Sequence, residues 1–351
     1  MRYKLAAACV LLPLLVACGG GGGNSGDNTT GGNATPDPDD NDQAPVATVE
    51  ERIRPASGTF QSAATPLRDN GANLFQNEGP QTVNAGRVAS WPGLRYGDFL
   101  LTNNPWNASA ATYEGWYQTV SLIEGANNTA TVIDWDWGAS ADIPEGASAF
   151  DTKSYPELIY GTKSQAERSG DYATTGLPVE IYDAPEITID YAYNFQGRRS
   201  SSATAGGTDS EFNVAIESFY HQSCDIQRTG QGTDNQVMEI MVWLHTGDNL
   251  PSGQAPVAVK TTADGKTFDV YVKTAGADPN PNYTAYVLRN ETLSGTILYS
   301  ELLRDAQDNA GVYGTYQLKD TDCLANILIG TEIWHGAGTF TLTDYQITRT
   351  Y

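Results

Sequence analysis

The chain has 351 residues, with 36 glycines, 19 tyrosines and 40% hydrophobic side chains, a composition that suits one large core and favours sheets joined by turns. Its 42 acidic residues exceed its 20 lysines and arginines, so the formal net charge is -22 at pH 7. A surface of this sign repels phosphate backbones and anionic lipids, which excludes nucleic-acid partners and electrostatic binding to membranes.

The first residues indicate a targeting segment. Arg2 and Lys4 form a short basic region, and the apolar stretch 5–16 that follows is too short to span a bilayer as a helix. With Cys18 after it, this pattern resembles a bacterial lipoprotein signal, which implies cleavage after residues 1–17 and lipidation of Cys18. Gly19 then favours an anchor in the outer membrane of the cell envelope. The alternative is an ordinary secretory signal and a secreted protein.

A polar segment follows the signal. It is rich in glycine, asparagine, aspartate and proline, so it cannot offset the entropy of ordering, and we expect 18–55 to be a flexible acidic tether. The acidic run at 37–42 lacks the glycine and distal glutamate of a calcium loop, which favours a plain linker. Residues 56–74 are ambiguous. Residues 75–351 are expected to form one folded domain.

Cysteine usage allows one disulfide. Cys9 leaves with the signal and Cys18 is the expected lipidation site, so Cys224 and Cys323 remain in a compartment where oxidation is possible. Their spacing leaves a bridge and two free thiols equally open. Neither these cysteines nor the three histidines have the spacing of a metal site, so we expect no metal and no cofactor.

The rest of the chain consists of short apolar or alternating runs separated by turns, which predicts an all-β fold. One segment, 294–308, has helical spacing. No repeat is found, so the pattern favours a sandwich of antiparallel sheets with one helix. The predicted strands are 99–102, 116–123, 129–137, 186–195, 212–220, 237–244, 257–262, 267–273, 284–289, 313–318, 325–333 and 338–348.

Two glutamates lie inside predicted strands near the C-terminus. Glu239 stands in the run VMEIMVWL, and Glu332 stands in LIGTEIWHG. A carboxylate among buried residues is costly unless it is paired or hydrogen-bonded. A pair of catalytic acids explains both positions.

The motifs around these glutamates resemble glycoside hydrolase family 12, over about residue 90 to the C-terminus. The resemblance implies a curved jelly roll of two stacked antiparallel sheets, whose concave face holds a β-1,4-glucan and hydrolyses it with retention of configuration. The motifs are Trp91, NNPW at 103–106, IDWDW at 133–137, KSYP at 153–156, NVAIE at 213–217, MEIMVW at 238–243 and GTEIWHG at 330–336.

The resemblance assigns roles to the acids. It makes Glu239 the nucleophile and Glu332 the general acid/base, a pair that retention places roughly 5–5.5 Å apart. Glu217 stands where the family usually carries aspartate, and it is expected to share a proton or a hydrogen bond with the nucleophile. Met241 lies two residues beyond Glu239 on the same strand face and is a candidate sugar contact or a core residue.

The resemblance also indicates substrate-binding side chains. Flat aromatic rings bind the apolar faces of sugars, while amides bind hydroxyl groups. Trp91, Asn104 and Trp106 match cleft residues of the family, and Trp334 is a candidate cleft wall. Trp135 and Trp137 share one strand face and either line the cleft or fill the core, where we expect at least one of them.

These observations predict an endo-acting β-1,4-glucanase of the cellulase type that binds β-glucan, needs no cofactor, is a monomer and contacts the membrane only through a lipid on Cys18. A xyloglucan-specific or mixed-linkage glucanase is the alternative within enzymes. A glycan-binding surface lipoprotein without activity is the alternative of another class. The paired acids disfavour it, because binding alone does not require them.

Overall fold

The computed structural model describes residues of the unit Val46–Tyr351. The expected signal 1–17 and Cys18 therefore lie outside the described residues. The described residues are 48–52, 93–96, 98–104, 117–124, 129–138, 152–163, 169, 175–198, 210–226, 235–247, 250–251, 255–273 and 282–351.

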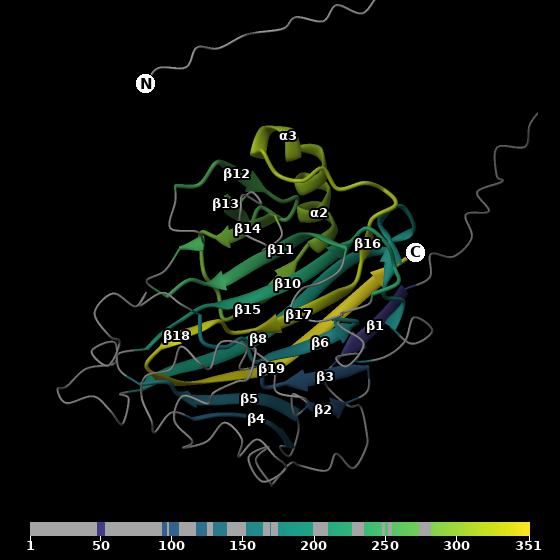
Figure 1. Ribbon diagram of the computed structural model, residues 1–351. Coiled ribbons are helices and arrows are strands. Elements are labelled where there is room, and N and C mark those ends of the chain that lie inside the picture. The colour runs from purple at the N-terminus through teal and green to yellow at the C-terminus, as the bar shows by residue number, and fades with distance from the viewer. Residues whose placement is uncertain are drawn as a thin grey trace, which may run out of the picture. The chain divides into compact units, whose positions relative to one another are not determined.

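Strands make up most of the described chain (Figure 1). In chain order they are β1 (Thr48–Arg52), β2 (Gly93–Tyr96), β3 (Phe99–Thr102), β4 (Tyr117–Glu124), β5 (Thr129–Asp136), β6 (Glu157–Gly161), β7 (Val179–Glu180), β8 (Glu186–Arg198), β9 (Glu211–Phe212), β10 (Val214–His221), β11 (Gln236–His245), β12 (Ala258–Thr261), β13 (Thr267–Lys273), β14 (Asn282–Leu288), β15 (Ser294–Ile297), β16 (Cys323–Leu324), β17 (Asn326–Gly330), β18 (Ile333–His335) and β19 (Ala337–Thr350).

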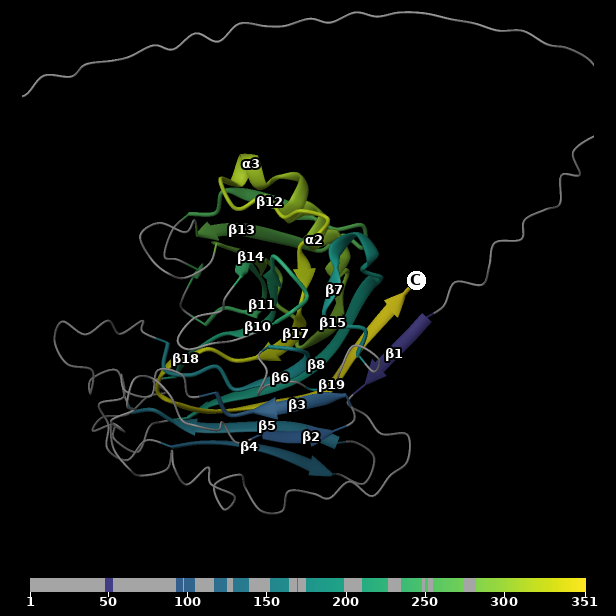
Figure 2. The same ribbon diagram turned by 45° about the vertical axis from the view of Figure 1, so that its right-hand side comes forward.

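These strands form two large sheets and one short ribbon. The smaller sheet has six strands in the order β15-β8-β19-β5-β4, with β1 paired to β19. The larger sheet has eleven strands, and its main path runs β12-β13-β14-β11-β10-β17-β6-β3-β2, with β16 and β7 attached beside β10. The ribbon pairs β18 with β9. Figures 1 and 2 show the larger sheet curving from β12 and β13 round to β2 and β3.

The main core lies between the two sheets, because successive side chains of a strand point to opposite faces. On β11, Met238, Ile240 and Leu244 are fully buried in this core. Phe99 on β3 meets Tyr345 on β19, with ring centroids 5.9 Å apart, and so joins one sheet to the other. Met241 and Trp243, on alternate positions of β11, face the other side of the larger sheet.

Helix α2 (Tyr299–Asp308) packs against β8. Its Leu302 and Ala306 are fully buried, and the Ser300 hydroxyl accepts a hydrogen bond of 2.8 Å from the backbone N–H of Ile187. The short helix α3 (Ala310–Tyr313) follows, and the 3-10 turn η6 (Ile181–Asp183) precedes β8. Among the described residues, no helix combines the length and apolar character that crossing a bilayer requires.

The all-β sandwich expected from the sequence is confirmed, with differences in its elements. The expected helix 294–308 is a helix only in its later part. Its first residues form β15, since Ile297 pairs with Ile189 of β8 and is buried in the core. The predicted strand 313–318 is wrong, because Tyr313 ends α3 and no strand begins before β16.

Several other features were not predicted. The pair β11 and β14 runs parallel, whereas the other described pairs are antiparallel. β1 falls inside the expected tether 18–55 and pairs along β19, with Thr48 opposite Thr350. β2, β6, β7 and β16 were also missed. Most of them are short, and strands of two to five residues give a weak alternation signal.

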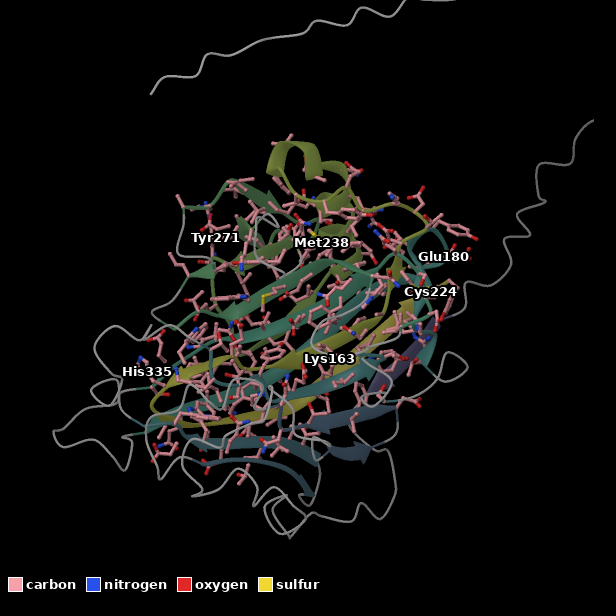
Figure 3. All side chains as sticks on the ribbon, in the orientation of Figure 1. Lys163, Glu180, Cys224, Met238, Tyr271 and His335 are labelled. Atoms are coloured by element: carbon pink, nitrogen blue, oxygen red, sulfur yellow. A yellow bond between two sulfur atoms is a disulfide. The ribbon has the colours of Figure 1, made fainter. Side chains whose placement is uncertain are left out.

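Cys224 and Cys323 form a disulfide, which settles the alternative that the sequence left open. It connects the segment after β10 to β16, whose Cys323 lies opposite Glu180 of β7. Figure 3 shows Cys224 and Glu180 at the same edge of the fold. The bridge closes a chain separation of 99 residues, and cross-links of this kind stabilise chiefly by restricting the unfolded chain.

Gly330, at the end of β17, packs closely against the backbone of the neighbouring segment. A Cβ atom on Gly330 would lie 2.3 Å from the carbonyl oxygen of Pro156 and 3.0 Å from the Cα of Glu157. Since those are backbone atoms, we expect Gly330→Ala to lower the free energy of unfolding by about 1–3 kcal/mol. Gly311→Ala is the matched control, because nothing lies within 4 Å of its added Cβ. Urea unfolding measures both, and equal stability would contradict this close approach.

Candidate active site

Two carboxyl groups of the candidate site lie on neighbouring strands. The register of β10 and β11 places Glu239 opposite Phe219 and Glu217 opposite Met241, so the glutamates are diagonal neighbours on one sheet face. Both face away from the main core, because alternate residues of β11 such as Met238 fill that core. A hydrogen bond joins the two carboxyl groups. The sheet thus brings together the predicted nucleophile and the predicted third acid.

The third carboxyl group comes from the connection between β17 and β18. Asn213, between β9 and β10, holds Glu332 through both ends of its amide: Nδ2 donates to the carboxyl Oε2, and Oδ1 accepts from the backbone N–H of Glu332 at 2.8 Å. The backbone N–H of Asn213 donates to the carbonyl of Glu332 at 3.0 Å. Thr331 adds a hydroxyl bond of 2.5 Å to the carbonyl of Asn213. These bonds fix the direction of the Glu332 side chain.

The environment raises the pKa of all three acids by different means. The pKa of Glu332 is raised to about 8, first by burial and then by the charge of Glu217, while the hydrogen bond from Asn213 opposes the increase. Burial also raises the pKa of Glu239, but the hydrogen bond from Glu217 counteracts it. The pKa of Glu217 lies well above its ordinary value, first through burial and then through the charge of Glu239. The hydrogen bond between Glu217 and Glu239 therefore favours the ionised form of Glu239 and the protonated form of Glu217.

The same interactions show that the acids converge. The charge of Glu332 acts on the pKa of Glu239, and the charge of Glu217 acts on the pKa of Glu332. Effects of this kind are strong only over a few ångströms. The structure therefore brings Glu217, Glu239 and Glu332 to one site, while their catalytic roles remain predictions.

An apolar group of side chains lies next to the acids on the same face of the larger sheet. We call it the outer-face cluster. In it, Met241 accepts a hydrogen bond from the indole N–H of Trp243 at 3.5 Å, and the rings of Trp243 and Trp334 have centroids 6.0 Å apart. Aromatic rings suit the apolar faces of sugars, although the cluster itself is buried, with Trp243 4% and Trp334 6% exposed. The cluster consists of Ala215, Met241, Trp243, Tyr271, Ala285, Val287 and Trp334, with Tyr283 packed against it.

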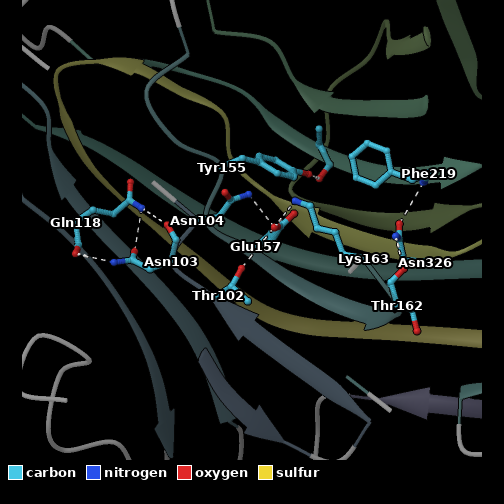
Figure 4. Close-up of polar contacts among 11 residues, drawn as sticks. Thr102, Asn103, Asn104, Gln118, Tyr155, Glu157, Thr162, Lys163, Phe219 and Asn326 are labelled. Atoms are coloured by element: carbon cyan, nitrogen blue, oxygen red, sulfur yellow. Dashed lines mark hydrogen bonds and ion pairs between the residues drawn. The ribbon is translucent and has the colours of Figure 1, made fainter. Parts of the chain in front are cut away.

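A polar group lies around β6 and β3, on the side of β10 away from β11 (Figure 4). The carboxyl group of Glu157 is fully buried, and its Oε1 accepts from Asn104 Nδ2 at 2.8 Å, from Lys163 Nζ at 2.6 Å and from Thr102 Oγ1 at 3.4 Å. Figure 4 shows Lys163 between Glu157 and the ring of Phe219. A cation and two further donors stabilise the buried carboxylate, all through this one oxygen.

No model of a protein family matches the sequence. Among curated proteins, endoglucanase S of Pectobacterium parmentieri is 24% identical over 250 residues, covering 71% of this chain and 81% of that protein. A probable xyloglucan-specific endo-beta-1,4-glucanase A of Aspergillus terreus is 23% identical over 261 residues, covering 73% of this chain and 84% of that protein.

Solved structures agree with these relatives. A family 12 xyloglucanase from Bacillus licheniformis superposes with a TM-score of 0.57 and 19% identity, covering 75% of this chain and 97% of that one. Endoglucanase 3 of Trichoderma harzianum, from family GH12, has a TM-score of 0.51 and 17% identity, with 76% and 96% covered. The fold is that of glycoside hydrolase family 12. The resemblance inferred from the sequence motifs is thereby confirmed.

The substrate-binding residues expected from family 12 lie in different places, and two of them are outside the described residues. Met241 and Trp334 lie together in the outer-face cluster and are 5% and 6% exposed. Asn104 is 2% exposed and its amide N–H binds Glu157, while its amide oxygen has no hydrogen-bond partner among the described residues. Trp91 and Trp106 lie outside the described residues. Contact of any of these side chains with substrate stays a prediction.

The ambiguous tryptophans of the IDWDW motif belong to the core of the family 12 fold. Trp135 is fully buried and lies edge-on to Phe212, with ring centroids 5.1 Å apart. Trp137 is also buried, and its indole N–H donates to Gln118 at 2.9 Å. Both are core residues, where at least one was expected.

Sequence reasoning assigned no role to Asn213, Trp243, Glu157 or Lys163. Trp243 had a usable signal, since it stands four residues after Glu239 and therefore on the same strand face. The other three had none, because their importance comes from partners on other segments. In the described part of the chain, no three His, Cys, Asp or Glu residues group in a way that could hold a metal ion.

Proposed function

We propose that the chain is a retaining, endo-acting β-1,4-glucanase of the cellulase type. The observation that carries this proposal is the convergence of Glu217, Glu239 and Glu332 at one site of a family 12 fold. The curated relatives are endoglucanases and xyloglucan-specific glucanases, and they support a glycoside hydrolase.

Retaining hydrolysis needs one ionised and one protonated carboxyl group. In the first step the carboxylate of Glu239 bonds to the anomeric carbon, the bond to the glycosidic oxygen breaks, and Glu332 gives that oxygen its proton. In the second step Glu332 takes a proton from water, and the water oxygen displaces Glu239 from the anomeric carbon. The pKa of about 8 at Glu332 suits an acid that starts protonated at neutral pH.

Glu217 supports the nucleophile without touching the sugar. Its own pKa lies well above the ordinary value because of burial and the charge of Glu239, so it retains a proton that it shares with Glu239. That hydrogen bond orients the Glu239 carboxylate and disperses its negative charge.

The proposal leaves two classes of polymer as candidate substrates. The outer-face cluster provides flat rings beside the acids, which suits a glucan chain with or without side branches. A xyloglucan-specific or mixed-linkage glucanase is therefore the second candidate, supported by the xyloglucan-specific relatives. A glycan-binding protein without activity is less well supported, because Glu332 is held by Asn213 in a way that binding alone does not require.

We further propose that the enzyme is a monomer held at the bacterial cell envelope by a lipid on Cys18, with a tether between the anchor and the catalytic domain. The basic and apolar N-terminal residues followed by Cys18 support the anchor. Labelling of growing cells with a fatty acid, compared between the native protein and Cys18→Ser, tests it directly.

The proposed activity is tested by incubating the purified protein with carboxymethylcellulose, xyloglucan and barley mixed-linkage glucan. We expect a rapid fall in viscosity and a ladder of oligosaccharides, as internal cleavage produces. ¹H NMR of the first product should show the β anomer at the new reducing end. An initial α product would contradict retention, and no product from any of the glucans would refute the proposed function.

A further inference from the structure

Lys163 lies at the end of β6, close to the acids, and no step of the reaction described above uses it. Its ammonium group forms an ion pair of 2.6 Å with the buried Glu157. It also lies over two aromatic rings, 5.5 Å from the centroid of Phe219 and 5.9 Å from that of Tyr155. Three contacts from three segments restrict a side chain that normally moves freely in solvent.

The backbone just before Lys163 is tied through Asn326 to the strand that carries Glu217. Asn326 of β17 accepts from the backbone N–H of Phe219 at 3.2 Å and donates to the carbonyl of Thr162 at 2.9 Å (Figure 4). The backbone N–H of Thr162 donates to the carbonyl of Ala325, also at 2.9 Å. The position of the lysine relative to β10 is therefore fixed by hydrogen bonds rather than by chance contact.

This arrangement places the ammonium group beside the nucleophile. Phe219, over which Lys163 lies, is the residue directly opposite Glu239 in the pairing of β10 with β11. Tyr155, the other ring, donates its hydroxyl to the carbonyl of Ala215 on β10 at 3.0 Å. The lysine is thus held against the same sheet face that carries the acids.

We propose, on the basis of the function above, that Lys163 is a positioning residue: held by Glu157 between the rings of Tyr155 and Phe219, it supplies the positive charge that keeps the nucleophile Glu239 ionised beside two other carboxyl groups.

The charges around the site agree with this role. Burial raises the pKa of Glu239, Glu332 raises it further, and Lys163 and Lys273 lower it, in addition to the hydrogen bond from Glu217. Lys163 likewise lowers the pKa of Glu217 against the larger effects of burial and Glu239. Without a cation, a buried site with this many acids would retain further protons and lose its nucleophile.

Glu157 has a matching part. It lies opposite Gly330 on β17 and Thr102 on β3, within the same sheet. Asn104 donates a neutral hydrogen bond to Glu157, and Lys163 supplies the positive charge that balances the negative charge of Glu157. The ion pair of Lys163 and Glu157 therefore brings a positive charge near the acids while its own net charge is close to zero. Glu157 fixes the position of the lysine ammonium group.

The test compares wild type with Lys163→Met, Lys163→Arg and the double variant Lys163→Met/Glu157→Gln. For Lys163→Met we expect the acidic limb of the pH profile of kcat/KM to move to higher pH by about 0.5–1 unit, because removal of a nearby positive charge disfavours the carboxylate. Lys163→Arg keeps the positive charge, so its acidic limb should stay close to that of wild type. Thermal melting shows whether each variant is folded.

A shift in Lys163→Met can arise from loss of the lysine charge or from the Glu157 charge that is then left unbalanced. The double variant separates these two causes. Lys163→Met alone leaves the Glu157 carboxyl group without its cation, whereas Glu157→Gln removes that charge while an amide oxygen can still accept from Asn104. The shift should persist in the double variant. A shift that disappears there, or an acidic limb that stays in place in Lys163→Met, would overturn the proposal.

A second measurement tests the role of Lys163 independently of whether the protein hydrolyses glucans. A ¹³C NMR titration of glutamate carboxyl groups, assigned with Glu239→Gln, follows the ionisation of Glu239 without substrate. An upward shift in Lys163→Met supports the inference even if wild type cleaves no glucan, and an unchanged titration refutes it even if wild type is active.

Discussion

Glu239→Gln is expected to lower the rate of glucan hydrolysis by a factor on the order of 10⁴ while leaving the protein folded. The amide keeps the shape of the side chain and its place opposite Phe219, but it cannot attack the anomeric carbon. The measurement is kcat/KM on a soluble glucan. Glu186→Gln, an exposed position at the start of β8, is the matched control and should retain full activity. Substantial turnover by Glu239→Gln would refute its role as nucleophile.

Azide distinguishes the two acids from each other. In Glu239→Ala, azide enters from the side that the carboxylate has vacated, so an activated aryl β-cellobioside should yield the α-glycosyl azide. In Glu332→Ala, Glu239 still forms the glycosyl-enzyme, and azide then displaces it to give the β-glycosyl azide. The opposite pair of products would mean that the roles of the two glutamates are exchanged.

The acids could be predicted from the sequence because each signal was local. Glu239 and Glu332 stand inside apolar runs where a carboxylate is costly, and the neighbouring tryptophans and glycines carry the family pattern. Strand alternation then correctly predicted that Glu239 and Met241 share a face. The convergence of the acids follows from the pairing of β10 with β11 and from the bonds between Asn213 and Glu332.

What the sequence could not predict depends on contacts between distant segments. Asn213 and Glu332 are 119 residues apart, and Asn104 and Glu157 are 53 apart, so no window contains either pair. Lys163 stands next to a turn, and nothing near it in the chain indicates that Phe219 will lie under its ammonium group.

The segment 294–308 shows the same limit for the fold. Its apolar spacing suits a helix throughout, yet Ser294–Ile297 joins β8 as β15 because an open sheet edge is available to it there. Local preference therefore identified Tyr299–Asp308 correctly and failed where a neighbouring strand offered backbone partners.

Glu332→Gln is expected to have the second largest effect on activity. Hydrolysis of a glucan should fall by about 10²–10⁴-fold, because the departing sugar oxygen then leaves without a proton. A 2,4-dinitrophenyl glycoside should lose far less in its first step, since that leaving group needs little protonation. Wild-type kcat/KM is expected to fall above about pH 8, as Glu332 loses its proton, and this fall should disappear in the variant. Equal losses on both substrates would contradict a role in protonation.

The same variant also gives a prediction for stability. The folded protein raises the pKa of Glu332 from 4.5 to about 8, mainly through burial, so folding favours the protonated form. The contribution of this group to the free energy of unfolding is therefore complete below about pH 4.5 and is lost as the pH rises through 8.

Gln cannot ionise, so between pH 5 and pH 8 the free energy of unfolding of Glu332→Gln should rise relative to wild type by roughly a few kcal/mol. Urea unfolding at both pH values measures this change, and the control Glu186→Gln should not show it. Identical pH dependence in wild type and Glu332→Gln would mean that the carboxyl group is not held protonated by the fold, which would remove the physical basis for its action as the acid.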